Sequence, residues 1–364
     1  MVRGLMVWVL GILTAAAPLP PQGYAAAAAT ESNNQHKLVW AGGRLYVTYS
    51  KVASGISHVF VDVSTDGRTW RSLGQISRGE VPSTLSTLIV DPRGRVHVLW
   101  TRFDGGIGRV YHSRYDGRWS PQTPLSSAAS YAGYPSLDVA SGGRLHLVWY
   151  GIREASAGQP VSHGGIYEIY YLTSDGRWSP PERLSGGIPD ALNAAIAVDG
   201  QDRPHVTWFQ SDGQAFQVFY TVRDGTWTPP IPLTSGPQPS TKPAIAVDGG
   251  GRVHLVWERL ERGQPAIYYL TGDRGRWSRP LRISERGGRH PTVGLWMRGV
   301  FALWQDEDGT VTLRAFDGRW RAPRRLGPGD YPNATPWKGS GPLVPFAVWT
   351  TRDGIRVVDL AALL

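Results

Sequence analysis

The sequence predicts an all-β protein, and within that class a single β-propeller built from four-stranded blades. Tryptophan (16), tyrosine (15) and glycine (45) are abundant among the 364 residues, while charged residues make up only 18%, a composition typical of β proteins with many tight turns. Short runs with period-two alternation, such as RVHVLW at 95–100 and RVHLVW at 252–257, are bounded by Gly, Asp and Pro. Runs of this kind recur along nearly the whole chain, which indicates a repeat architecture.

Two anchor positions define the repeats. The first is the aromatic residue that ends a run of the form G-R-x-H-x-x-W, and it recurs every 45 to 59 residues, at Tyr49, Trp100, Trp149, Trp208, Trp257, Trp304 and Trp349. The second is the tryptophan of D-G-x-W, at Trp70, Trp119, Trp178, Trp227, Trp277 and Trp320. The two anchors alternate strictly, so we predict seven repeats, with the anchor rings buried as structural wedges between blades.

Four strands are expected in each repeat, and we call these positions A to D. In the first repeat they are predicted at 37–40, 44–49, 58–64 and 71–77, and four short strands in about 50 residues are typical of a propeller blade. The seventh repeat supplies only A, B and C, so the simplest closure lets the segment before Lys37 provide the missing outer strand and remove a free sheet edge. A six-bladed ring with a C-terminal extension is the alternative.

Residues 1–29 are predicted to be a secretory signal peptide. Arg3 precedes an apolar stretch from Leu5 to Leu19, and small residues follow at 25–29. The apolar stretch is short and interrupted by Pro and Gly, so we expect no membrane span in the mature chain, with an uncleaved N-terminal anchor as the alternative. The expected organisation is therefore an exported, extracellular protein with a spacer or closing strand at 30–36 and a propeller at 37–364.

Composition also limits the classes of partner. The chain has no cysteine, which excludes disulfides and zinc–thiolate sites. Its net charge of +9 would suit nucleic acid or an acidic polysaccharide, but the arginines are scattered and form no run of five, so we do not expect nucleic-acid binding. We expect a monomer without a cofactor.

The turn between strands C and D resembles a known signature. S-T-D-G-R-T-W at 64–70 is similar to the Asp-box of sialidase-like propellers, S-x-D-x-G-x-T-W, although one residue is missing between Asp66 and Gly67. The equivalent aspartates are Asp66, Asp116, Asp175, Asp224, Asp273 and Asp317. We predict a structural role for them, because an aspartate can accept hydrogen bonds from backbone N–H groups two or three residues on. The resemblance implies a propeller fold rather than an activity.

A second repeated set consists of His97, His146, His205 and His254 in strand B. Equivalent positions on successive blades should lie too far apart to share one ion at about 2.1 Å. We therefore predict packing roles for these histidines and no metal site.

Binding residues are expected at the end of the ring that carries the irregular B–C turns and D–A connections, because variable loops on a regular scaffold usually carry function. The predicted ligand-binding residues are Arg102, Asp104, Arg153, His163, Arg259, Arg289 and Tyr331. The D–A connections also offer Tyr131, Tyr134, Asp190, Asn193, His290, Asp330 and Asn333. Arginines, carboxylates and tyrosines together suit a sugar, since they offer bidentate recognition, hydroxyl acceptors and stacking faces.

Three functions remain open from the sequence. A sialidase would need an arginine triad and a tyrosine nucleophile, but no position here matches these, and the Arg-Ile-Pro signature is missing. A glycosidase needs two carboxyl groups about 5 to 9 Å apart, for which Glu154, Glu258 and Asp306 are candidates. We favour a non-catalytic propeller that binds a glycan or another cell-surface ligand, ahead of a protein-interaction platform and a sialidase-like glycoside hydrolase.

Overall fold

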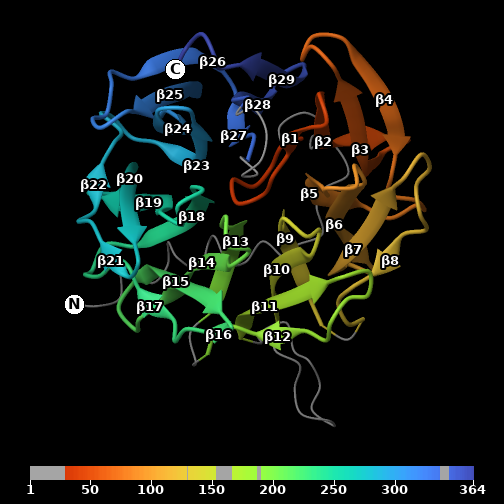
Figure 1. Ribbon diagram of the computed structural model, residues 1–364, viewed down its shortest axis with the longest axis horizontal. Coiled ribbons are helices and arrows are strands. Elements are labelled where there is room, and N and C mark those ends of the chain that lie inside the picture. The colour runs from red at the N-terminus through yellow and green to blue at the C-terminus, as the bar shows by residue number, and fades with distance from the viewer. Residues whose placement is uncertain (1–28, 129, 153–165, 187–189, 337–343) are drawn as a thin grey trace.

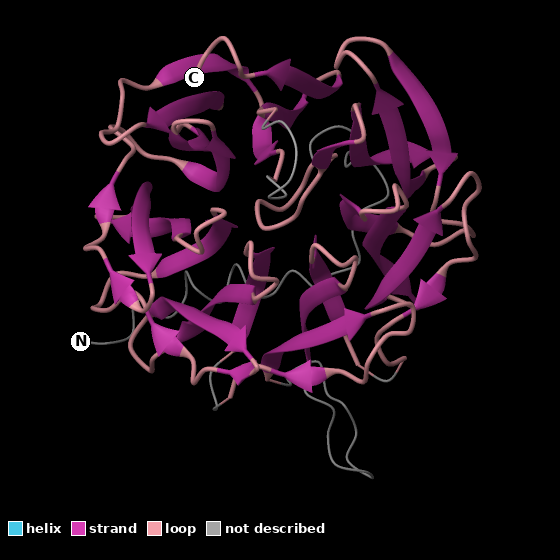
Figure 2. Cartoon of the chain, in the orientation of Figure 1, coloured by secondary structure: helices cyan, strands magenta, loops and turns pink. Residues whose placement is uncertain are grey.

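The computed structural model describes residues 29–128, 130–152, 166–186, 190–336 and 344–364. Seven small antiparallel sheets stand around a central axis, each with its first strand nearest the axis (Figure 1). The predicted β-propeller and its seven blades are confirmed, and the six-bladed alternative is excluded. The described part consists of strands and loops (Figure 2), and it contains no helix long and apolar enough to cross a membrane.

Blades 1 to 4 follow one another along the chain. Blade 1 contains β1 (Leu38–Ala41), β2 (Arg44–Ala53), β3 (Ile56–Ser64) and β4 (Trp70–Gln75). Blade 2 contains β5 (Ser83–Val90), β6 (Val96–Asp104), β7 (Ile107–Tyr115) and β8 (Thr123–Pro124). Blade 3 contains β9 (Ala132–Val139), β10 (Leu145–Ile152), β11 (Tyr167–Ser174) and β12 (Glu182–Arg183). Blade 4 contains β13 (Ala191–Val198), β14 (Pro204–Ser211), β15 (Phe216–Asp224), β16 (Thr226–Trp227) and β17 (Ile231–Pro232).

Blades 5 to 7 complete the ring. Blade 5 contains β18 (Ser240–Val247), β19 (Val253–Glu261), β20 (Gln264–Asp273), β21 (Arg276–Trp277) and β22 (Leu281–Arg282). Blade 6 contains β23 (Arg289–Trp296), β24 (Gly299–Gln305), β25 (Thr310–Phe316) and β26 (Arg324–Pro328). Blade 7 contains β27 (Asp330–Ala334), β28 (Phe346–Thr351) and β29 (Gly354–Asp359), and these three strands form its sheet in the described part of the chain.

The ring is closed at its axis by residues 29–37, which we call the hub segment. The prediction that residues 30–36 form an outer strand of blade 7 is wrong, because they form no strand and instead pass from blade to blade around the axis. Thr30 bonds blade 7 through Thr350 Oγ1 (2.9 Å) and the Tyr331 carbonyl (3.0 Å). The apolar contact between blades 7 and 1 is made by Phe346 and Val348 of β28 with Leu38, Leu45 and Val47.

Three amide side chains of the hub segment form hydrogen bonds with the other five blades, blades 2 to 6. Asn33 donates to the carbonyl oxygens of Lys242 (2.9 Å) and Pro291 (2.8 Å), in blades 5 and 6. Asn34 donates to the carbonyl of Ala194 in blade 4 (2.5 Å). Gln35 donates to those of Leu85 (2.9 Å) and Pro135 (2.7 Å), in blades 2 and 3. The polar sequence N-N-Q thus supplies the donors that these inner-strand carbonyls need.

The anchor aromatics lie where the blades pack. The first-anchor tryptophans have exposed fractions of 0–3%, and they are Trp100, Trp149, Trp208, Trp257, Trp304 and Trp349. The D-G-x-W tryptophans reach from one blade to the preceding one: Trp227 meets Tyr171 edge-on at 4.9 Å, and Trp277 meets Tyr220 at 4.8 Å. These edge-to-face contacts have a preferred orientation, so they stabilise one arrangement of neighbouring blades in addition to burying apolar area.

The C–D turns lie beside the A–B turns at one end of the ring, which we call the turn end. Asp66 accepts hydrogen bonds from the backbone N–H groups of Arg68 (2.8 Å) and Thr69 (2.7 Å), and these lower its pKa below the usual range. The later copies differ: Asp175, Asp224 and Asp273 face an arginine of the A–B turn of their own blade, namely Arg144, Arg203 and Arg252. Asp317 pairs with Arg321, and the Asp116 N–H donates to the Arg118 carbonyl (3.1 Å).

The strand-B histidines are also held at the turn end. In blade 4, His205 contacts Asp199 Oδ2 (3.2 Å) and the Tyr220 hydroxyl (2.6 Å). His97 contacts Asp91 (3.3 Å) and His112 (3.1 Å), while His146 and His254 contact Tyr171 (2.7 Å) and Tyr269 (2.8 Å). The histidines therefore bind neighbouring strands together. The described residues include no group of three or more His, Asp or Glu side chains that could hold a metal ion.

Candidate functional site at the axis

A β-bulge interrupts the innermost strand of blades 2 to 7 at the same place. In blade 2, Leu85 and Ser86 together lie opposite the single residue Trp100, because the pairing passes from Thr84↔Thr101 to Thr87↔Leu99. The equivalent bulges lie opposite Trp149, Trp208, Trp257, Trp304 and Trp349. Each buried anchor tryptophan thus faces a two-residue bulge, and a bulge re-aims the side chain that it carries.

The first residue of every bulge has a left-handed backbone, with φ between +50° and +55°. These residues are Leu85, Tyr134, Asn193, Lys242, His290 and Tyr331, and we call them the bulge ring. Glycine adopts this conformation at the lowest cost, whereas bulky side chains are rare in it. None of the six positions uses glycine, and the six side chains differ widely. Strain of this kind is concentrated at functional sites, so the bulge ring is the candidate site.

The charged half of the site comes from blades 5, 6 and 7. Glu258 is buried, and its Oε1 accepts hydrogen bonds from Lys242 Nζ (3.2 Å) and from the His290 N–H (2.7 Å). His290 Nδ1 contacts Asp330 Oδ1 at 2.7 Å, and its ring stacks on Tyr331 with centroids 4.1 Å apart. A carboxylate on Nδ1 fixes the ring orientation and leaves Nε2 as the other nitrogen for chemistry.

The aromatic half lies in blade 3. Tyr134 stacks on Tyr150 at 5.0 Å, and Tyr131 and Tyr167 meet Tyr150 at 6.0 and 5.5 Å. A Cβ atom at Gly133 would lie 2.6 Å from the Tyr131 hydroxyl oxygen, so glycine is needed there to seat this ring. Burial raises the pKa values of Tyr134 and Tyr150 well above the usual range, so both hydroxyls stay protonated. The result is a neutral aromatic surface beside a charged one.

Two titratable groups of the hub segment face each other at the axis. Burial raises the pKa of Glu31, the charge of Lys37 opposes that shift, and Asp330 adds to it. Burial lowers the pKa of Lys37 to about 7, again opposed by its partner Glu31. Lys37 Nζ donates to the carbonyl oxygens of Ser86 (2.5 Å) and the Gln35 side chain (2.7 Å).

The predicted ligand-binding arginines of blades 2 and 5 are tied into their own blades. Arg102 pairs with Asp104 (2.6 Å) and lies over the Tyr111 ring, whose hydroxyl also donates to Asp104 (2.7 Å). Arg259 lies over the Tyr268 ring in the equivalent place of blade 5 and donates to Gln238 (3.2 Å). These arginines therefore belong to separate blade-edge networks and form no triad with each other.

The other predicted residues are divided. Tyr331 belongs to the bulge ring, and the exposed Arg289 precedes His290 on β23. Glu258 acts as the buried counter-ion just described, while Asp306 accepts bonds from Trp304 Nε1 (2.7 Å) and Thr312 Oγ1 (2.6 Å) at the B–C turn of blade 6. Arg153, Glu154 and His163 lie outside the described residues.

Sequence reasoning did not identify Lys242 and Leu85, although a signal for the bulge ring was present. The bulge residue lies 14 to 18 positions before the anchor tryptophan. Proline follows it in four of the six blades, at Pro135, Pro243, Pro291 and Pro332. Proline inside an innermost strand is expected only at a bulge or strand start, so X-Pro at this spacing marks the site.

Comparison with known proteins supports the fold assignment. No family model matches the chain, and no curated protein matches it, so the Asp-box resemblance stays a prediction. Among solved structures, an ulvan lyase of polysaccharide lyase family PL25 is similar with a TM-score of 0.66, 12% identity, 92% of this chain covered and 93% of the other. The polysaccharide lyase Uly1 matches with a TM-score of 0.57 and 11% identity over 94% of each chain.

Other matches are less specific. A protein of unknown function from Dyadobacter fermentans DSM 18053 has a TM-score of 0.57 and 14% identity, over 78% of this chain and 95% of that one. Sialidases are also among the matches, including a leech intramolecular trans-sialidase with a TM-score of 0.49 and 10% identity. At these identities the likeness establishes the propeller fold, and glycan-processing enzymes are among its neighbours.

Proposed function

We propose that the protein is exported and, as a monomer, binds an acidic glycan at the bulge ring. One observation carries this proposal: six equivalent bulges present Leu, Tyr, Asn, Lys, His and Tyr in a backbone conformation that favours glycine. If the bulges only shaped the backbone, glycine would serve at each of them. Leu85 and Asn193 are buried, while the other four are partly exposed. Tyrosine faces for stacking, an imidazole and an ammonium group suit a sugar acid.

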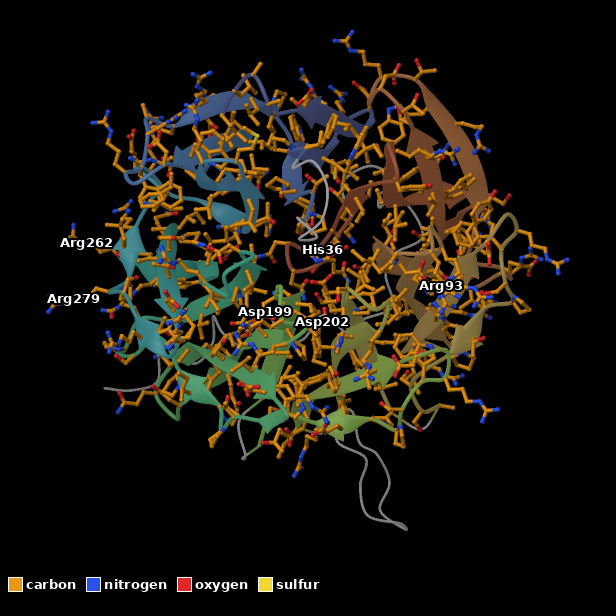
Figure 3. All side chains as sticks on the ribbon, viewed as in Figure 1. His36, Arg93, Asp199, Asp202, Arg262 and Arg279 are labelled. Atoms are coloured by element: carbon orange, nitrogen blue, oxygen red, sulfur yellow. The ribbon has the colours of Figure 1, made fainter. Side chains whose placement is uncertain are left out.

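The charge distribution supports an acidic ligand. Residues 240–328, which form blades 5 and 6, hold 16 Arg and Lys against 9 Asp and Glu, whereas residues 130–238 of blades 3 and 4 hold 6 against 10. Arg262 and Arg279 project at the outer edge of blade 5 (Figure 3). Lys242 and Arg289 lie on the innermost strands of blades 5 and 6. An acidic chain would be drawn towards this half of the ring.

A second candidate function is cleavage of the same glycan by β-elimination. It is favoured by the His290–Asp330 pair with the Tyr331 ring stacked beside it. His290 Nε2 would accept the proton from the carbon next to a uronate carboxyl group, and the Tyr331 hydroxyl would protonate the departing oxygen. The ulvan lyase cited above was solved bound to -[GlcA(1-4)Rha3S]-, so such a uronate fragment is a suitable first ligand.

The experiment uses the chain from Thr30 with uronate-containing, sulfated and matched neutral oligosaccharides. Binding is measured by calorimetry, and each product is examined for an unsaturated uronate and for new reducing ends. Binding of acidic but not neutral oligosaccharides, lost in Lys242→Ala and kept in Arg93→Ala, supports the proposal. An unsaturated product establishes elimination; reducing ends without it establish hydrolysis. Equal binding of both oligosaccharide classes, or none, would refute the acidic-glycan site.

A further inference from the structure

We infer that the hub segment positions the bulge ring, with Asn33 as the positioning residue of its charged half. This inference rests on the proposed function. The hub amides do not bond arbitrary backbone groups near the axis. Every carbonyl that Asn33, Asn34 and Gln35 bond belongs to a bulge, either to its first or to its second residue. These are the residues whose conformation directs the site side chains.

Asn33 matches two bulges at once. Its side-chain amide has two N–H donors, and both are used, one on the Lys242 carbonyl and one on the Pro291 carbonyl. Pro291 directly follows His290, so one amide fixes the bulges that carry the lysine and the histidine of the site. Glu258 links the same two residues from the other side, because it accepts from both Lys242 Nζ and the His290 N–H. The spacing between ammonium and imidazole is thereby held from two directions.

Gln35 offers a matched comparison within the same segment. Its two amide donors also bond bulge carbonyls, those of Leu85 and Pro135. These bulges belong to blades 2 and 3, whose bulge-ring residues are the apolar Leu85 and the aromatic Tyr134. Asn33 and Gln35 are both buried. Loss of Asn33 removes its two buried hydrogen bonds, and loss of Gln35 removes three, because Gln35 also accepts from Lys37 Nζ. Gln35→Ala should therefore lower the melting temperature at least as much as Asn33→Ala.

A segment that only closes the ring and a segment that positions the site predict different results. Under simple closure, each variant weakens ligand binding in proportion to the stability it loses, so Gln35→Ala has at least as large an effect as Asn33→Ala. If the hub positions the site, the effect follows the bulge that each amide holds. Asn33→Ala then disturbs recognition of the acidic group, while Gln35→Ala disturbs only the stacking surface around Tyr134.

The first readout is the ratio of affinities for an acidic oligosaccharide and its neutral counterpart. We expect Asn33→Ala to lower this ratio about tenfold and Gln35→Ala to leave it within about twofold, although Gln35→Ala loses at least as much stability. Asn33→Ser keeps one donor and should give an intermediate ratio, and it replaces the alanine variant if that variant does not fold. Equal changes in the ratio for Asn33 and Gln35 variants would overturn the inference.

The second readout needs no ligand. The ring NMR signals of His290, assigned by their loss in His290→Gln, report its contact with Asp330 and its stacking on Tyr331. At a fixed pH their chemical shifts should change in Asn33→Ala and remain as in the wild type in Gln35→Ala. This measurement separates the two proposals: if the wild type binds no acidic glycan, the proposed function fails, and the chemical shifts alone decide the positioning role. Unchanged His290 chemical shifts in a folded Asn33 variant contradict that role.

Discussion

At the turn end of the ring related contacts recur in several blades, whereas at the bulge ring the backbone is constant in blades 2 to 7 and the side chains change. His205 and His97 each contact an aspartate of the A–B turn, through Asp199 and Asp91. At the other end, equivalent bulges carry Lys242 in one blade and Tyr134 in another. A residue that is repeated from blade to blade indicates a structural role. A residue that varies on a strained but constant backbone indicates a role in ligand binding.

The largest effect is expected at the turn end. Asp199 accepts backbone hydrogen bonds from Gln201 and Arg203 (2.9 Å each) and pairs with the Arg203 side chain and His205. Asp199→Ala removes these contacts, although Arg203 still pairs with Asp224 and His205 still contacts Tyr220. It should lower the free energy of unfolding by about 2–3 kcal/mol in urea titrations. Glycan affinity of the folded fraction should stay as in the wild type. A large loss of affinity without a loss of stability would reverse the comparison.

The second prediction concerns Lys242, at φ +50°. Lys242→Gly should lower affinity for an acidic glycan at least about tenfold, because the ammonium group is lost. Lys242→Ala also removes the ammonium group. The free energy of unfolding of Lys242→Gly should be about 1 kcal/mol higher than that of Lys242→Ala, because glycine adopts the left-handed backbone conformation without strain. Calorimetry and urea unfolding measure the two effects. If the alanine variant is the more stable, the strain argument for the bulge ring is wrong.

The third prediction is a pH dependence from the hub segment. The pKa of Lys37 is about 7 in the folded protein against 10.5 ordinarily, so the unfolded chain binds more protons between these values. The free energy of unfolding should therefore rise with pH from about 7 towards 10, by up to about 1.4 kcal/mol per pH unit. The same contribution is lost as the pH is lowered from about 10 back to about 7. Lys37→Met should flatten this slope.

Exposed Lys51 provides the control for that measurement. Lys51→Met should leave the slope of the wild type, since an exposed ammonium keeps the same surroundings on unfolding. Equal slopes in the wild type and Lys37→Met would show that Lys37 does not cause the dependence.

The smallest effect is expected for an exposed pair of the turn end. Arg144 and Asp175 are 2.9 Å apart, but their side chains are 55% and 64% exposed. Arg144→Ala should change the free energy of unfolding by no more than about 0.5 kcal/mol, because solvent and salt screen such pairs. A loss of stability as large as that of Asp199→Ala would contradict our view that exposed turn-end ion pairs contribute little and buried ones contribute much.

The fold could be predicted from local sequence patterns. Period-two runs, turn residues and the recurrent Trp100 and Trp119 types of anchor predicted the strands of each blade and favoured seven blades over six. The hub segment was misassigned, because N-N-Q before Lys37 reads as a polar spacer. The partners of its three amide side chains lie between 50 and 258 residues away in the chain, and no local pattern reveals them.

The candidate site was only partly predictable for the same reason. Tyr331 and Arg289 were named as loop residues, but Lys242 was not, since its place in a strand conceals its bulged conformation. Arg102 and Arg259 looked available for a ligand, and the structure engages them with their own blades.

By itself, the sequence determined a propeller of repeated small sheets and favoured seven of them, because alternation and turn chemistry act between neighbours in the chain. Only the tertiary structure decided what lies at the axis. The bulge ring gathers single residues from six blades, and the hub segment bonds them across the centre; such contacts depend on closure of the ring, which no single repeat encodes.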